Sequence, residues 1–103
     1  MHISSYKIIR DFIEKHADAK SPLTSWYRIV SKEIFKNFND VRKLFPNADQ
    51  VKNFVVFNIG GNKYRLIVFI KYKLKHIYIS HILTNAEYDK DKWKEDSWYN
   101  SKD

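Results

Sequence analysis

The chain has 103 residues, the size of a single domain, since natural domains run from about 50 to 250 residues. Hydrophobic residues make up 44% and charged residues 30%, a globular balance that excludes a disordered chain. The absence of cysteine excludes disulfides, a thiol nucleophile and thiolate metal sites. The sequence starts without an apolar signal core, and its longest apolar run, Leu66–Ile70, is too short to span a membrane. We therefore expect a cytoplasmic protein.

The net charge of +7 and the aromatic content of 17% are both high for so small a chain. Residues 54–88 carry five basic side chains and a single acidic one. A basic, aromatic-rich surface favours a polyanionic partner, because lysines and arginines release counterions from phosphates. The alternative is that the charge only keeps the protein in solution.

Two amphipathic helices are expected near the N-terminus, after a short strand around Ile3. Apolar residues recur at helical spacing over residues 6–16. Ser21 followed by Pro22 is typical of a second helix start, with Ser21 as the cap and Pro22 at the first helical position. The apolar face of the first helix consists of Ile8, Ile9, Phe12 and Ile13, and that of the second of Leu23, Trp26, Tyr27, Val30 and Ile34.

Residues 37–53 show no sustained period, so we predict a loop with at most one short turn. Three strands are expected next, over residues 54–57, 64–72 and 76–83. Gly60–Asn62 suits a hairpin turn that needs positive φ, and a basic turn at 73–75 joins the last two strands. The second strand places Tyr64, Leu66, Val68, Ile70 and Tyr72 on one face and Arg65, Ile67, Phe69 and Lys71 on the other.

These elements predict an α+β fold in which two N-terminal helices pack on one face of a small, twisted, mainly antiparallel sheet. From Asp89 onward the chain mixes charges with Trp93, Trp98 and Tyr99, a pattern that fits either a short helix or a frayed end. We expect one domain over residues 1–89 and a charged C-terminal tail over residues 90–103.

No motif for a metal or a cofactor stands out. The chain lacks a glycine-rich phosphate loop followed by Lys and Ser or Thr. His76 and His81 lie five residues apart on one expected strand, so we expect them on opposite faces, where they cannot share a metal. Asp89, Asp91 and Glu95 resemble a calcium loop only superficially, because the required glycine is missing. We expect neither a metal nor a cofactor.

Arg65 is the first candidate for chemistry, because an arginine among apolar residues on a sheet face needs an anionic partner. That partner is either a phosphate or, in a purely structural role, Glu87 or Asp89. A position at the sheet edge facing water is a third interpretation. Residues 84–89 are the second candidate, because loops after strand ends often carry binding groups. Their polar, acidic and phenolic side chains suit acid–base roles, or they simply end the strand.

Two segments together resemble the HigB family of toxins within the wider RelE/ParE group: the run Asn58–Leu66 and the later Ala86–Asp89. The N-terminal part agrees in order and spacing, so the resemblance covers about residues 1–89. It implies two helices against a small twisted sheet, a RelE-like fold. It also implies a ribosome-dependent mRNA endonuclease, neutralised by an antitoxin usually encoded just downstream. The agreeing N-terminal segments are Lys15–Ala19, Pro22–Leu23, Trp26–Tyr27 and Phe45–Asp49.

One position departs from the resemblance. The family pattern is Thr-His-Ala-Glu-Tyr-Asp, whereas this chain has Asn85 in place of the histidine. An asparagine can hydrogen-bond a phosphate or a base, but it cannot exchange a proton near neutral pH. If the family's histidine acts as an acid or base, this chain is slower or uses another group.

The implied reaction is attack of a ribose 2′-hydroxyl on the neighbouring phosphate. It needs RNA held in line, positive charge at the phosphorane and proton transfer at two oxygens. We predict Arg65 as the phosphorane ligand, Tyr88 as a stacking group or proton donor, and Glu87 or His81 as the proton acceptor. The remaining RNA contacts are predicted at Lys63, Lys71, Asn58, Asn62 and Asn85.

The expected partners are a HigA-type helix-turn-helix antitoxin and mRNA on the ribosome. Three other functions stay open. One is a nucleic-acid-binding module without catalysis, which the basic surface and Asn85 permit. Another is a gyrase-directed toxin of the ParE kind. The third is a degenerate toxin kept only as an antitoxin-binding partner.

Overall fold

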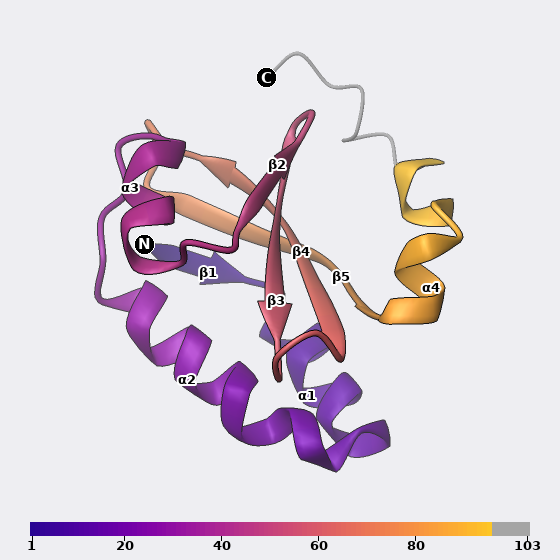
Figure 1. Ribbon diagram of the computed structural model, residues 1–103. Helices are drawn as coiled ribbons and strands as arrows, with labels where there is room; N and C mark the ends of the chain where they lie inside the picture. The colour runs from indigo at the N-terminus through magenta and orange to yellow at the C-terminus, as the bar shows by residue number, and fades with distance from the viewer. Residues whose placement is uncertain (96–103) are drawn as a thin grey trace.

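The computed structural model describes residues 1–95 and contains a five-stranded sheet in the order β1-β5-β4-β3-β2. Strand β1 is parallel to β5 and every other neighbouring pair is antiparallel, which confirms the expected mainly antiparallel α+β fold. Figure 1 shows α1 and α2 on one side of the sheet, with α4 beyond the end of β5. The elements are β1 (His2–Ser4), α1 (Tyr6–Lys15), η1 (Ala17–Ala19), α2 (Lys20–Ser31), α3 (Phe38–Leu44), β2 (Asp49–Val51), β3 (Phe54–Ile59), β4 (Tyr64–Lys71), β5 (His76–Thr84), α4 (Asn85–Asp89) and η2 (Lys92–Glu95).

The main core lies between the sheet and the first two helices. The alternation predicted for residues 64–72 is confirmed, because one face of β4 enters this core. The helices cover that face with buried side chains at the expected spacing. Full burial of each large apolar side chain contributes about 1.5–3 kcal/mol, which anchors β4 firmly. The β4 members are Tyr64, Leu66, Val68 and Ile70, and the helical members are Ile9, Leu23, Trp26 and Val30.

A second, smaller core lies on the opposite face of the sheet. Its buried members are Phe54, Val56, Ile67, Phe69 and Trp93. Trp93 belongs to η2, in the segment expected as a tail with either a short helix or a frayed end, and it is only 3% exposed. Trp93 of η2 therefore forms part of this face. Trp98 and Tyr99 lie outside the described residues.

The prediction of a loop over residues 37–53 was wrong, because the segment contains both α3 and β2. The side chain of Asn37 accepts a hydrogen bond from the backbone N–H of Asp40 and caps α3. Val41 of α3 is fully buried in the main core. Strand β2 pairs with β3 over three residues. Tertiary packing stabilises these short elements, which carry too few residues to show a period of their own.

The predicted bounds of the second helix were also wrong at both ends. Helix α2 begins at Lys20, and Ser21 makes no capping hydrogen bond. Pro22 is the third helical residue, a position that tolerates proline because first-turn N–H groups lack helical partners. The helix ends at Ser31, so Ile34 lies beyond it and is 59% exposed.

A β-bulge in β5 corrects the expectation for the two histidines. Ile67 pairs with His81 and Val68 pairs with Ile79, so Ser80 is the extra residue of the bulge. The extra residue moves His81 onto the same face as His76. The prediction of opposite faces was therefore wrong, although the β4 partners of the two histidines, Ile67 and Lys71, lie four positions apart, about 13 Å along the strand.

Candidate functional site

The turn between β3 and β4 positions Arg65 on the face of the second core. Gly60 and Gly61 have φ values of 62° and 70°, which confirms the expected positive φ at this turn. Arg65 is half-buried, and its Nη1 donates to the carbonyl oxygens of Asn62 at 3.2 Å and Tyr64 at 3.3 Å. These two bonds hold the guanidinium near the turn.

The structural role considered for Arg65 was an ion pair with Glu87 or Asp89. Among the side chains that the structure describes, no carboxylate forms an ion pair with Arg65. A half-buried guanidinium without a paired carboxylate retains its positive charge for an anionic ligand. This is the main electrostatic feature of the site.

Aromatic rings extend the site from Arg65 across the sheet face. The guanidinium carbon of Arg65 lies 5.5 Å from the centroid of the Tyr88 ring. Tyr88 in turn stacks on Trp93, with centroids 5.4 Å apart and planes 13° apart. Trp93 Nε1 donates to the Tyr88 carbonyl at 3.3 Å, and Lys94 Nζ lies 5.7 Å from the Trp93 centroid. Arg65, Tyr88, Trp93 and Lys94 thus form a cation–aromatic stack, of which sequence reasoning had found Arg65 and Tyr88.

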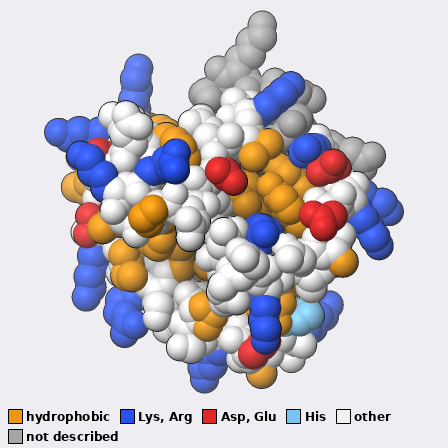
Figure 2. Space-filling view, viewed as in Figure 1, with side chains coloured by type: hydrophobic (Ala, Val, Ile, Leu, Met, Phe, Trp, Pro, Cys, Tyr) orange, Lys and Arg blue, Asp and Glu red, His pale blue; other side chains and the backbone are white. Residues whose placement is uncertain are grey.

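The surroundings of Tyr88 favour its protonated form. Burial raises the pKa of the Tyr88 phenol, the charge of Asp49 adds to this, and Arg65 opposes it in part. The phenol therefore keeps its proton at neutral pH and can donate it. Asp49 lies on β2 opposite Val56, on the same sheet face, and the wrong loop prediction had hidden it. Figure 2 shows this face as an apolar area between the strands and α4, bordered by acidic and basic side chains.

A pocket of about 320 Å³ lies next to the stack. It brings together both predicted proton acceptors, His81 from β5 and Glu87 from α4, and Ser80 Oγ lies 2.8 Å from His81 Nδ1. Sequence reasoning had missed the two lysines and the tryptophan that complete it. The lining residues are His81, Leu83, Glu87, Lys90, Lys92 and Trp93.

Glu87 and Thr84 form a capping box at the start of α4. Thr84 Oγ1 accepts from the Glu87 N–H at 3.2 Å, and Glu87 Oε1 accepts from the Thr84 N–H at 2.9 Å. The bond from the Thr84 N–H lowers the pKa of the Glu87 carboxyl, because it stabilises the charged form. Glu87 is thus an ionised and weakly basic carboxylate, which favours His81 as the proton acceptor.

The two predicted lysines lie away from Arg65. Lys63 forms an ion pair with Asp18 at 3.0 Å, and Tyr64 donates to the same carboxylate at 2.6 Å. The bonds from Tyr64 and Lys63 lower the pKa of the Asp18 carboxyl and tie the hairpin to η1, just before α2. Lys71 lies on the Arg65 face but six residues along β4, about 20 Å away.

The three predicted asparagines lie nearer to Arg65. Asn58 pairs directly with Arg65 in the β3–β4 register. Asn58 and Asn62 both line a second pocket of about 390 Å³ beside the Phe45–Ala48 segment. Asn85 is exposed as the first residue of α4, and its backbone N–H donates to the Lys63 carbonyl at 3.2 Å.

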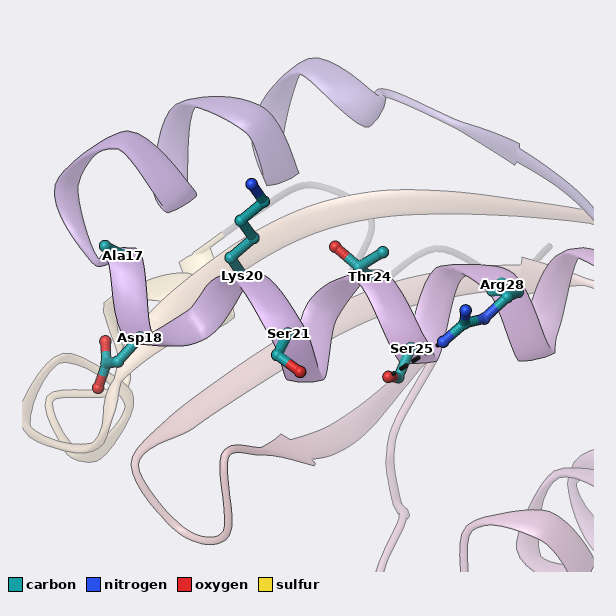
Figure 3. Close-up of a pocket in the computed structure, with 7 residues that line it drawn as sticks. All are labelled: Ala17, Asp18, Lys20, Ser21, Thr24, Ser25 and Arg28. Carbon is teal, nitrogen blue, oxygen red and sulfur yellow. Dashed lines mark hydrogen bonds between the residues drawn. The ribbon is translucent and has the colours of Figure 1, made fainter.

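A further hollow of about 490 Å³ follows the start of α2 (Figure 3). Lys20 and Thr24 point toward the side of α1, whereas Asp18 points away from them. Arg28 donates to Ser25 Oγ at 3.5 Å within this surface. Because α2 packs on the main-core face, this hollow is separate from the Arg65 site.

Two kinds of feature are absent from the described residues. Among the side chains that the structure describes, His, Cys, Asp and Glu do not gather in groups of three or more that could hold a metal ion. None of the helices over residues 1–95 combines the length and the apolar character needed to cross a membrane.

Comparison with known proteins defines the class. Residues 19–91 match the family model of the HigB toxins, described as the RelE-like toxic component of a toxin–antitoxin system. The chain belongs to this family, as its resemblance had predicted. It is 30% identical over 92 residues to the mRNA interferase toxin HigB of Escherichia coli K12, covering 86% of this chain and 88% of that protein. It is 33% identical over 93 residues to the mRNA interferase HigB of Escherichia coli O6:H1, covering 87% and 90%.

Proposed function

We propose that this toxin cleaves mRNA on the ribosome and is neutralised by a HigA-type helix-turn-helix antitoxin. Membership of the HigB family and the names of its relatives support the activity. The single observation that carries the proposal is Arg65. Its guanidinium lies on the sheet face beside a protonated phenol and forms no ion pair with a described carboxylate.

In the proposed reaction, the ribose 2′-oxygen attacks the adjacent phosphorus while the bond from phosphorus to the 5′-oxygen breaks. One proton leaves the 2′-hydroxyl and another reaches the departing 5′-oxygen, so the new end carries a 5′-hydroxyl. Arg65 neutralises the extra negative charge on the phosphorane. His81 accepts the first proton and Tyr88 donates the second. Asn58, Asn62 and Asn85 contact the RNA near Arg65, and Lys63 and Lys71 contact it farther away.

The assay that tests this function is cell-free translation of a defined mRNA with the purified chain added. We expect new RNA ends that carry a 5′-hydroxyl, and we expect none when ribosomes are omitted. Adding the cognate antitoxin in excess should abolish them. RNA binding without any cleavage would instead favour the non-catalytic module that Asn85 permits. Inhibition of gyrase with intact mRNA would favour the ParE-like alternative.

A further inference from the structure

The pocket beside the cation–aromatic stack combines a small volume with both apolar and charged lining side chains. Its volume of about 320 Å³ lies at the lower end of the range of ligand pockets, about 300–1,000 Å³. Trp93 and Leu83 supply apolar walls, and Glu87 supplies a charged acceptor. Lys90 and Lys92 add two cations to the same pocket. Aromatic, acceptor and cationic groups together match a nucleotide with its base and phosphate.

We propose that this pocket binds one base of the mRNA next to the cut and that Glu87 selects a base carrying an exocyclic amino group. The proposal rests on the proposed function and adds a specificity-determining residue to it. A carboxylate accepts hydrogen bonds and donates none. Adenine, cytosine and guanine each offer amino donors, whereas uracil offers one N–H flanked by two carbonyl oxygens that repel a carboxylate.

The capping box fixes the Glu87 carboxylate for this role. Oε1 accepts from the Thr84 N–H, and Oε2 makes no hydrogen bond to any residue that the structure describes. The group therefore presents one acceptor oxygen that none of the described residues uses. The lowered pKa of Glu87 keeps that oxygen charged at neutral pH. A rigid acceptor discriminates between bases better than a mobile one, because less side-chain entropy is lost on binding.

The stack links this pocket to the cleavage chemistry. Trp93 forms a wall of the pocket and also stacks on Tyr88, whose ring lies beneath the Arg65 guanidinium. A base on Trp93 thus belongs to a nucleotide close to the phosphate held by Arg65. Lys90 and Lys92 then contact the backbone of that nucleotide.

The variant Glu87→Gln tests the proposal directly. Glutamine preserves a capping box, so the fold is retained, but its amide adds a donor that uracil carbonyls can accept. Asp89→Asn is the matched control, because Asp89 is exposed on the same short helix and does not line the pocket. Cut positions are mapped in cell-free translation of mRNAs that together offer every base at each position around the cut.

We expect Glu87→Gln to raise the share of cuts with uracil at one fixed position by about 5- to 100-fold, and Asp89→Asn to leave the profile unchanged. An unchanged base profile in active Glu87→Gln overturns the proposal. If the wild type makes no cuts, the proposed function is wrong, but the pocket can still be tested. Binding of AMP and UMP is then measured by quenching of tryptophan fluorescence. Tighter binding of AMP than UMP, lost in Glu87→Gln, then supports the pocket, and equal binding overturns it.

Discussion

Replacing Arg65 with alanine removes the positive charge at the centre of the site and little else. The guanidinium contributes a contact with the Tyr88 ring and two hydrogen bonds to backbone carbonyls. A partly exposed cation–π contact is worth about 0.5–1 kcal/mol, and the carbonyls lie near an exposed turn where water replaces the lost bonds. We therefore expect a loss of stability near 1 kcal/mol, or a fall in Tm of about 4–8 °C.

The effect of the same change on cleavage should be far larger. Loss of one electrostatic stabiliser of a charged transition state typically costs about 100- to 1000-fold in rate. Arg65→Lys should recover only part of this, because an ammonium cannot make the planar two-point contact of a guanidinium. Melting curves and ribosome-dependent cleavage are measured on the same preparations, with antitoxin binding as the control for folding. Full residual cleavage, or a loss of Tm and antitoxin binding that parallels the loss of activity, refutes the role of Arg65.

Three further predictions concern the surface and titrating groups. RNA binding should weaken by about 20-fold between roughly 50 and 200 mM salt if three phosphates are neutralised, and a flat affinity would show that charge does not drive binding. Asn85→His should raise the cleavage rate and add an inflection near the histidine pKa of about 6.5, and an unchanged pH–rate profile would contradict this. The pKa of His76 is lowered by burial and then by His2, so the folded state favours neutral His76. The contribution of His76 to the free energy of unfolding is thus fully present above about pH 6.5 and is lost as the pH falls below that value. Tm measured against pH should show this fall, and His76→Gln should reduce it.

Much of the fold follows from local pattern. The alternation in β4 and the paired glycines before it predict the hairpin that presents Arg65. The apolar stripe of the first helix likewise predicts α1 within one residue. In these elements local preference and tertiary packing agree, so the pattern alone suffices.

The sequence of β5 contains a pattern that indicates the bulge, although strict alternation of faces does not predict it. Ile77 and Ile79 are buried on one face, and the next buried residue of the strand is Ile82, three positions on rather than two. That spacing marks the extra residue at Ser80 and reverses the face of His81. An apolar spacing of three inside a strand is therefore the pattern that predicts the correct face.

Other parts of the site depend on contacts that no local pattern contains. Asp49 reaches the site because β2 adds three residues to the edge of the sheet, and so short a strand shows no period. Trp93 lies in a charged segment and is buried only because β3 and β4 offer it an apolar surface. The positions of both residues therefore depend on tertiary packing, which the local sequence pattern does not contain.

Growth of bacteria that express the chain without antitoxin tests the central claim most directly. Cultures producing the wild type, the soluble Arg65→Ala variant, or the wild type together with its antitoxin are compared, and the 5′ ends of their mRNA are mapped. The account predicts that only the wild type alone stops growth and produces new 5′-hydroxyl ends in translated mRNA. Normal growth with intact mRNA, in cells that contain soluble and folded wild-type protein, would contradict it.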